Sequence, residues 1–112
     1  MKTVTKKPIN TVNKGRAIEL KAKKKLIAEG YLVDKKIRSR FASPDFYGLF
    51  DLLAIKEDHM RLVQVKSNPT DFYKARKYII EWKTFNNITH NTEIWLYKGR
   101  KDKIDLWRIE AL

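Results

Sequence analysis

The sequence predicts a single α/β domain in which a small mixed β-sheet is flanked by two helices. Three observations lead to this prediction. Apolar residues recur at helical spacing in two segments, residues 14–29 and 71–86. Short apolar or alternating runs, which are typical of strands, separate and follow these segments. The 112 residues, 43% of them hydrophobic, suffice for the core of one domain.

The first helix is expected over residues 14–29, after a basic arm of residues 1–13. Asn13 is of the residue class that caps helix starts, and Gly30 favours the left-handed conformation that ends helices. The apolar side of this helix is made by residues four apart: Ile18, Ala22 and Leu26. The arm is expected to lie outside the folded domain and to contribute phosphate contacts at most. Residues 14–112 are expected to form the single domain.

Three strands are expected to follow. Residues 31–38 form the first, and residues 49–56 are almost continuously apolar, which is typical of a strand buried on both faces. Residues 61–67 alternate, with Leu62, Gln64 and Lys66 on one face and Val63 and Val65 on the other. The short turn at residues 57–59 makes the second and third strands a hairpin.

A second helix and two more strands complete the order α-β-β-β-α-β-β. Asn68 at the N-cap, Pro69 at the first helical position and Asp71 in the first turn indicate a helix start. The apolar stripe of this helix consists of Phe72, Ala75, Ile79 and Trp82. The last two strands and the turn between them are expected over residues 93–98, 104–110 and 99–103.

The charge of the chain points to a polyanionic partner. Lysine and arginine number 25 against 13 acidic residues, so the net charge is +12. Such a surface binds nucleic acid because each phosphate contact releases condensed counterions. The absence of cysteine excludes a disulfide scaffold, a thiolate zinc site, an iron–sulfur cluster and a cysteine nucleophile. Without an apolar run of about 18 residues or an apolar leader, a soluble cytoplasmic protein with no membrane partner is expected.

Four side chains depart from their local patterns and together predict a site. Asp51 lies in the apolar second strand, where a buried carboxylate needs a cation, a metal or strong donors. Gln64 and Lys66 point to one face of the next strand, and strand pairing can bring Asp51 to that face. Glu19 lies at the edge of the apolar stripe of the first helix. Three oxygen ligands beside a lysine predict a site for Mg²⁺ or Mn²⁺, in which Lys66 holds the attacking water.

Each of these residues also has a purely structural interpretation. Glu19 can pair with Lys23 one turn later, and Asp51 can form a turn at the end of its strand. The two polar residues of the next strand can belong to a solvated face. Pro44-Asp45 offers a competing acidic residue, but it lies in a predicted loop, and a carboxylate on a strand is held more rigidly.

The motifs resemble those of the PD-(D/E)XK nuclease superfamily, and within it those of small archaeal Holliday-junction resolvases. The matching stretches are residues 14–19 (KGRAIE), 50–55 (FDLLAI) and 62–67 (LVQVKS). The resemblance implies a restriction-endonuclease-like core with Glu19, Asp51, Gln64 and Lys66 as catalytic residues. It also implies that Glu19, Asp51, Gln64 and the backbone carbonyl of Val65 hold Mg²⁺ or Mn²⁺. Because Gln64 replaces an acidic residue of the family, weaker metal binding is expected.

The expected activity is metal-dependent hydrolysis of DNA phosphodiester bonds, selective for a branched structure such as a Holliday junction rather than for sequence. The residues expected to contact the DNA backbone are Lys14, Gly15, Arg16, Arg38 and Arg40. Gly15 would let a phosphate approach the N-terminus of the first helix. Two alternatives stay open: a nucleic-acid-binding module of the same fold with weak or lost catalysis, and a small RNA-binding protein.

A homodimer is also expected. Symmetric cleavage of a junction or duplex takes two active sites, and a two-fold dimer is the commonest way to double a site. Aromatic residues are enriched in the cores of interfaces. The chain carries more large apolar side chains than one small core easily buries: Phe72, Tyr73, Tyr78, Ile80, Phe85, Trp95, Tyr97 and Trp107.

Overall fold

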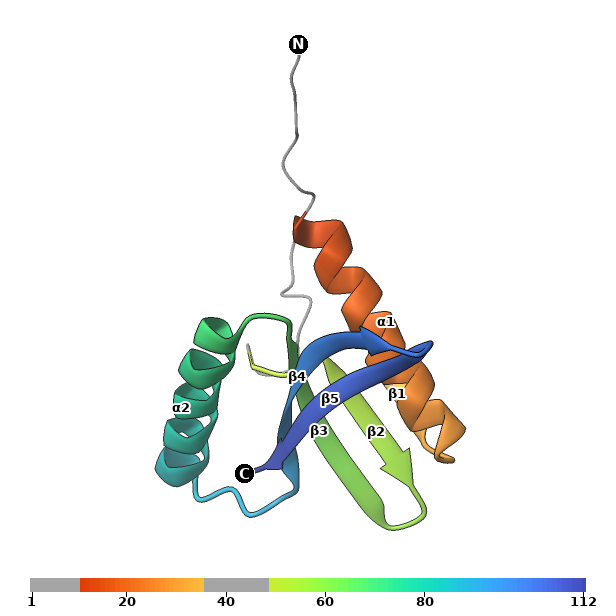
Figure 1. Cartoon of the computed structure of the whole chain (residues 1–112). Helices are drawn as coiled ribbons and strands as arrows, with labels where there is room; N and C mark the ends of the chain where they lie inside the picture. Colours follow the sequence, from red (N-terminus) through yellow and green to blue (C-terminus); the bar gives the residue numbers. More distant parts are fainter. Residues whose placement is uncertain (1–10, 36–48) are drawn as a thin grey trace.

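A computed structural model describes residues 11–35 and 49–112 (Figure 1). The elements are α1 (Thr11–Ala28), β1 (Leu32–Lys35), β2 (Leu52–Lys56), β3 (His59–Lys66), α2 (Pro69–Asn86), β4 (Thr92–Lys101) and β5 (Ile104–Ala111). The predicted order α-β-β-β-α-β-β is confirmed. The five strands lie in sequence order across one mixed sheet, in which β3 and β4 are parallel and all other neighbours are antiparallel. The crossover that a parallel pair requires is α2.

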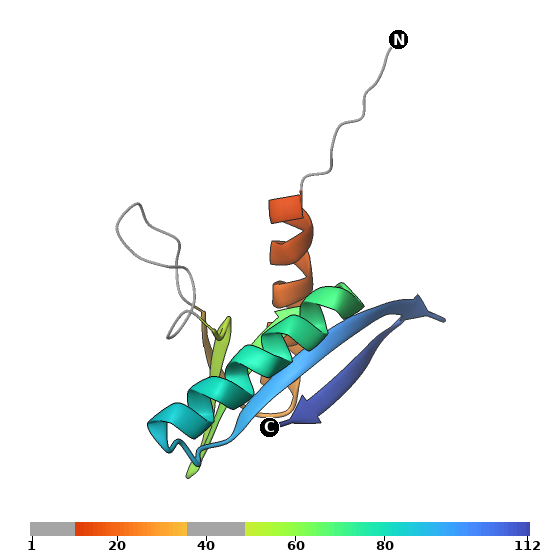
Figure 2. The same ribbon diagram turned by 90° about the vertical axis from the view of Figure 1, so that its left-hand side faces the viewer.

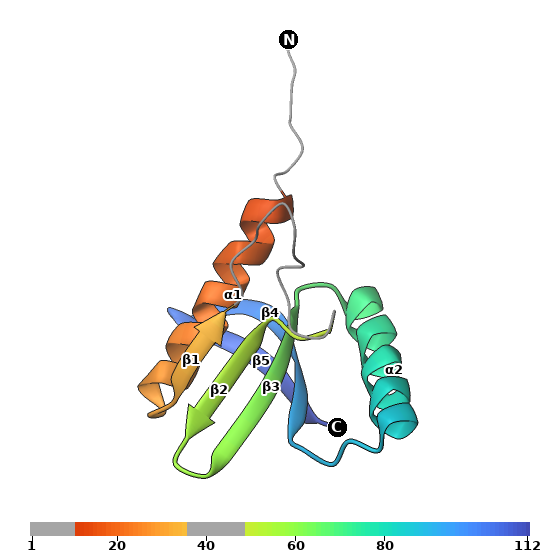
Figure 3. The ribbon, with the colours of Figure 1, turned by 180° about the vertical axis from the view of Figure 1, so that it is seen from behind.

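The two helices pack against opposite faces of the sheet, as Figure 3 shows from behind. Alternate residues of β4 illustrate the division, because Trp95 points toward α1 while Ile94 and Leu96 point toward α2. The core on the α1 side contains Ile18, Ala22, Leu26, Leu52, Ala54, Val63, Val65 and Trp95. The core on the α2 side contains Phe50, Leu62, Phe72, Ala75, Ile79, Ile94 and Leu96.

Helix α1 begins earlier than the sequence suggests. It starts at Thr11, so Asn13 lies inside the helix instead of capping it, and three residues of the expected arm are helical. The end agrees with expectation: α1 stops at Ala28, and Gly30 follows with φ +96°. The first turns of α1 extend past the sheet (Figure 2).

Helix α2 starts as predicted. The side chain of Asn68 accepts hydrogen bonds from the backbone N–H groups of Thr70 (2.8 Å) and Asp71 (3.2 Å), and Pro69 opens the helix. Of the predicted stripe, Phe72, Ala75 and Ile79 are buried, while Trp82 is half-buried. In the described ranges, 11–35 and 49–112, no helix is long and apolar enough to cross a membrane.

Several strand boundaries differ from the predicted ones, and those around the β4–β5 turn differ where residues have positive φ. The β2–β3 hairpin is confirmed, but His59 already belongs to β3. Gly99 lies within β4 with φ +99°, at a register shift between Tyr97 and Arg100, so it forms an irregularity in the strand. The predicted turn at 99–103 is therefore too long. The hairpin reverses at Asp102-Lys103, where both residues have positive φ, as two-residue hairpin turns require.

The large apolar residues behind the homodimer prediction separate into two groups. Trp95 and Phe72 are fully buried, and Tyr97 and Trp107 pack against the core on the α1 side. The others remain exposed on α2: Tyr73, Tyr78, Ile80 and Phe85. The homodimer stays a prediction.

An ion pair joins β3 to β4 at the end of β3 remote from its C-terminus. Arg61 donates two hydrogen bonds to the carboxylate of Glu93, from Nε to Oε2 and from Nη2 to Oε1, both 2.6 Å long. Trp95 Nε1 also donates to Glu93 Oε1 at 2.9 Å, and the guanidinium lies 4.9 Å from the ring centroid of Tyr31. The bonds to Glu93 raise the pKa of Arg61 above its ordinary value. Because both side chains are mostly buried, removing one leaves the other poorly solvated.

Glu93→Gln should therefore lower the free energy of unfolding by about 2 kcal/mol, because a charged acceptor of three hydrogen bonds is lost. Urea denaturation followed by tryptophan fluorescence measures the loss. The matched control is Glu110→Gln, which breaks the more exposed pair between Arg76 and Glu110 and should cost less than about 1 kcal/mol. Equal losses would contradict a central role for the Arg61–Glu93 pair.

Candidate active site

A pocket of about 430 Å³ lies where α1, the start of β2, the end of β3 and the first turn of α2 meet. We call it the strand-end pocket. Six of the residues that line it are ones that the sequence singles out: Lys14, Gly15, Glu19, Asp51, Val65 and Lys66. Ligands of α/β proteins commonly bind at the carboxyl ends of strands, next to the start of a helix, and this pocket has that position.

Asp51 reaches the pocket from a bend, not from within a strand. The prediction that it lies inside the strand is wrong, because β2 begins at Leu52. The bend also explains why Phe50 packs on the α2 side of the sheet while Leu52 packs on the α1 side. Asp51 donates its backbone N–H to Val63 O (2.9 Å), and its Oδ2 accepts the N–H of Val65 (2.9 Å). A carboxylate inside the buried strand would lack such a donor, whereas the bend provides one.

Lys66 and Gln64 occupy different surroundings, although they lie two residues apart on β3. Lys66 lines the strand-end pocket and is half-buried, and its Nζ forms no hydrogen bond or ion pair with the described part of the chain. Gln64 does not line that pocket and is 9% exposed. Its Oε1 is buried and accepts no hydrogen bond within the described residues. The structure thus brings Lys66, but not Gln64, into one pocket with Asp51.

Glu19 lines the strand-end pocket from α1. Its Oε1 lies 3.1 Å from Nζ of Lys35, the last described residue of β1, so its partner is not Lys23, the alternative that the helical spacing offers. Both side chains of the pair are partly exposed, so it contributes little to stability. Its effect is to orient the Glu19 carboxylate between β1 and the pocket.

Asp71 lines the strand-end pocket, although the sequence predicts for it only a place in the first turn of a helix. It is exposed and adds a third carboxylate to the lining, while its neighbours Ser67 and Asn68 complete that wall. The side-chain oxygen of Asn68 caps α2. Their position in the sequence could have identified them as pocket residues, because they directly follow the C-terminal end of a buried strand.

Only two of the five residues predicted to contact DNA line the strand-end pocket. Lys14 and Gly15 line the strand-end pocket, and Arg16 is exposed on α1 outside its lining. Arg38 and Arg40 lie outside the described residues, as does the competing Asp45. Gly15 follows the first turn of α1, so the free N–H groups belong to the residues before it, and the prediction that Gly15 marks the helix N-terminus is wrong. A Cβ at this glycine would meet nothing within 4 Å, so the surface there is open.

The oxygen atoms of the pocket suit a hard divalent ion with few protein ligands. Within residues 11–35 and 49–112 no three His, Cys, Asp or Glu side chains lie close enough together to hold a metal. The lining of the pocket nevertheless contains the carboxylates of Glu19 and Asp51, whereas the buried Oε1 of Gln64 lies outside that lining. Mg²⁺ is commonly bound by one or two carboxylates, several waters and a substrate phosphate. The donor set therefore fits Mg²⁺ or Mn²⁺.

Comparison with known proteins adds no functional assignment. No protein-family model matches the sequence, and no curated protein matches it either. Function is therefore inferred from the residues of the strand-end pocket and from the charge of the chain.

Gln64→Leu should leave the free energy of unfolding unchanged or raise it by up to about 1 kcal/mol, because it removes a buried oxygen that has no donor. The matched control is Thr92→Val. Thr92 is fully buried, and its hydroxyl donates to Leu112 O at 3.1 Å, so this change should cost about 1 kcal/mol. Urea denaturation of both variants provides the comparison. A loss for Gln64→Leu as large as that for Thr92→Val would show that the amide has a stabilising partner.

Proposed function

We propose that the protein is a metal-dependent endonuclease that hydrolyses phosphodiester bonds of DNA. The observation that carries the proposal is the meeting of Asp51, Glu19 and Lys66 in one pocket. Lys66 has no anionic partner among the described residues, although three carboxylates, those of Glu19, Asp51 and Asp71, line the same pocket. A lysine left unpaired beside carboxylates is suited to a reaction in which negative charge develops. The net charge of +12 supports a nucleic acid as the substrate.

Each residue then has a role. Asp51 and Glu19 would hold the divalent ion, and the resemblance to the PD-(D/E)XK superfamily adds Gln64 and the Val65 carbonyl as ligands within a restriction-endonuclease-like core. When bound, Mg²⁺ or Mn²⁺ polarises the phosphate and makes a bound water more acidic. Lys66 orients the attacking water in line with phosphorus and neutralises charge in the transition state. The resemblance also implies products with 5′-phosphate and 3′-hydroxyl ends.

Recognition is expected to depend on the shape of the DNA. Lys14 at the pocket would contact a phosphate, as would Arg16, which is exposed on another side of α1, and phosphate contacts position a protein without reading sequence. A branched substrate, such as a Holliday junction, offers backbone from more than one arm to such a surface. This favours structure-selective cleavage.

A second candidate is a nucleic-acid-binding module with weak or lost hydrolysis. The neutral Gln64 and its position outside the pocket lining favour this alternative, because the amide adds no negative charge and its oxygen is not among the ligands that the pocket offers. The two candidates share the fold and the basic surface, so only a cleavage measurement separates them.

Lys66→Ala should lower the cleavage rate at least about 100-fold while changing DNA affinity less than about threefold, since one of 25 basic residues is a small part of the total attraction. The assay uses labelled four-way, flapped, duplex and single-stranded DNA with Mg²⁺ or Mn²⁺. Lys77→Ala, an exposed lysine on α2, is the matched charge control, and Asp51→Ala tests the metal ligand.

Three outcomes would contradict this assignment. Equal losses of binding and cleavage would make Lys66 a phosphate anchor. Cleavage that persists in a chelator would remove the metal from the proposal. Tight binding with no cleavage of any DNA by the wild type would leave the binding module as the function.

Gln64→Glu should tighten Mn²⁺ binding roughly tenfold, because it adds a negative charge to the ligand set. Titration calorimetry without DNA measures the affinity, and Gln64→Leu, which removes the amide oxygen, should bind Mn²⁺ more weakly than the wild type. If all three proteins bind Mn²⁺ equally, Gln64 is not a ligand.

A further inference from the structure

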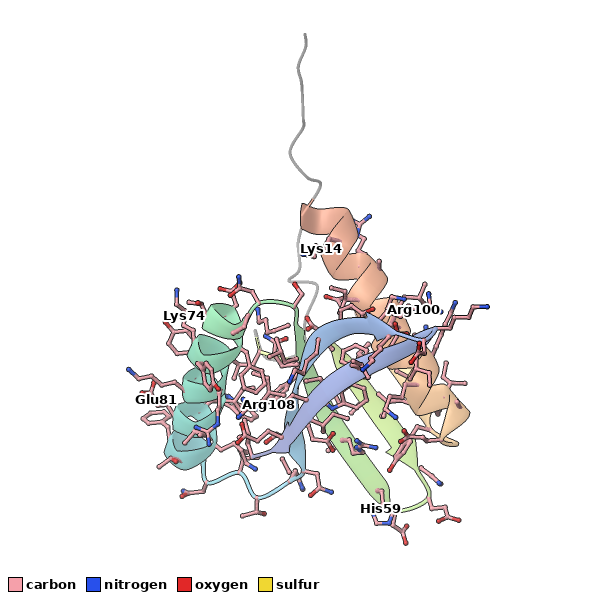
Figure 4. All side chains as sticks on the ribbon, viewed as in Figure 1. Lys14, His59, Lys74, Glu81, Arg100 and Arg108 are labelled. Carbon is pink, nitrogen blue, oxygen red and sulfur yellow. The ribbon has the colours of Figure 1, made fainter. Side chains whose placement is uncertain are left out.

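A second pocket, of about 450 Å³, lies between the C-terminal half of α1 and the β4–β5 hairpin. We call it the hairpin pocket. Its lining contains four basic residues, one carboxylate and one indole: Lys21, Lys24, Lys25, Arg100, Asp105 and Trp107. Figure 4 shows Arg100 on this hairpin, close to α1, and Lys14 farther along the same helix. The lining therefore has an excess of three positive charges.

The carboxylate in the pocket neutralises only part of this charge. Asp105 Oδ1 lies 3.3 Å from Lys21 Nζ and 3.9 Å from Arg100 Nε. It also accepts a hydrogen bond of 2.8 Å from the hydroxyl of Tyr97, which with Lys21 lowers the pKa of Asp105 below its ordinary value and keeps it ionised. Lys24 is exposed and pairs with no acidic residue in the described part of the chain. Lys25 pairs with Glu29 (2.9 Å), so Lys24 and Arg100 are the basic groups most available to a ligand.

The floor of the hairpin pocket is held rigidly. Trp107 packs edge-on against Trp95 (5.3 Å between ring centroids) and Tyr97 (5.0 Å). Trp95 is fully buried, so this aromatic group belongs to the core on the α1 side. Lys21 lies over the Tyr97 ring at 5.8 Å, which fixes its position at the rim. An anion that binds Lys21 therefore orders a side chain that is already held in place, with little loss of side-chain entropy.

A row of lysines on α1 connects the two pockets. Lys21 and Lys25 follow Lys14 by seven and eleven residues, so all three lie within about 20° of one line along the helix. Lys14 lines the strand-end pocket, whereas the other two line the hairpin pocket. At about 1.5 Å per residue, the row spans roughly 10 to 16 Å along the helix axis. Phosphates of one DNA strand advance about 3.4 Å per nucleotide, so the row matches three to five nucleotides.

We propose that the hairpin pocket binds backbone phosphates of the DNA substrate, three to five nucleotides from the bond that is cleaved at the strand-end pocket. The identity of the ligand as DNA rests on the proposed function. The alignment of Lys14, Lys21 and Lys25 favours an extended polyanion over a single small anion, because only a chain of phosphates reaches both pockets along one side of α1.

The test compares two double variants that each lower the net charge of +12 by two. Lys24→Ala with Arg100→Ala changes the hairpin pocket, and Lys74→Ala with Lys77→Ala changes exposed lysines of α2. Figure 4 shows Lys74 and Arg100 on opposite sides of the molecule. Binding of labelled DNA without divalent ions is measured by fluorescence anisotropy at several salt concentrations. The hairpin variant should bind about tenfold or more weakly at 0.1 M salt, with the salt slope reduced by about 2, while the α2 variant stays near the wild type.

A length series locates the contact. In a second set of substrates, the DNA strand at the strand-end pocket extends only two nucleotides to each side of the branch point. No phosphate of that strand then reaches the hairpin pocket, so the hairpin variant should bind these substrates as well as the wild type does. Equal losses in the two double variants would overturn the proposal, since they would reflect net charge alone. A hairpin variant that binds and cleaves like the wild type would overturn the proposal while leaving the endonuclease function intact. A wild type that shows the binding pattern but cleaves no DNA would overturn the endonuclease and support the phosphate site.

Discussion

The parallel pairing of β3 with β4 determines where polar groups can gather in this fold. Parallel neighbours need a crossover connection, which α2 provides on one face, and α1 covers the other face. As a result β3 is buried from Leu62 to Val65 and admits no unpaired charge along that stretch. Polar groups collect where the strand ends and the chain passes between the helices, and there Asp51, Lys66 and Glu19 meet.

Charged side chains are paired at one end of β3 and not at the other, within the described residues. At one end Arg61 and Glu93 neutralise each other through two short hydrogen bonds, and Trp95 completes the network. At the other end Lys66 has no partner among the described residues, and Oε1 of Gln64 accepts no hydrogen bond there. Buried polar groups of native proteins are usually satisfied, and exceptions gather at functional sites. One end of β3 is therefore held by a neutralised ion pair, whereas the other end carries a lysine without a partner among the described residues.

Features that depend on neighbouring residues could be predicted from the sequence, and features that depend on distant contacts could not. The start of α2 was predictable because Asn68 and Pro69 act on the backbone beside them. The bend at Asp51 was not, because it depends on an N–H that Val65 donates from the neighbouring strand. The partner of Glu19 likewise lies on β1, not on its own helix. The motif residues were identifiable by type, but which of them share a pocket is decided by tertiary structure.

Helix α1 links the two proposed contact regions because one narrow side of it packs on the sheet. Ala22 at the centre of that side is fully buried and small, so the helix lies close to the sheet and its flanks stay accessible. Lys14 and Glu19 extend from α1 to the strand-end pocket, while Lys21 and Lys25 extend to the hairpin pocket. A change in the seating of α1 therefore alters both pockets together. Of these two pockets, the β4–β5 hairpin lines only the hairpin pocket, so changes in the hairpin can adjust the proposed phosphate contacts without displacing the groups proposed to cleave DNA.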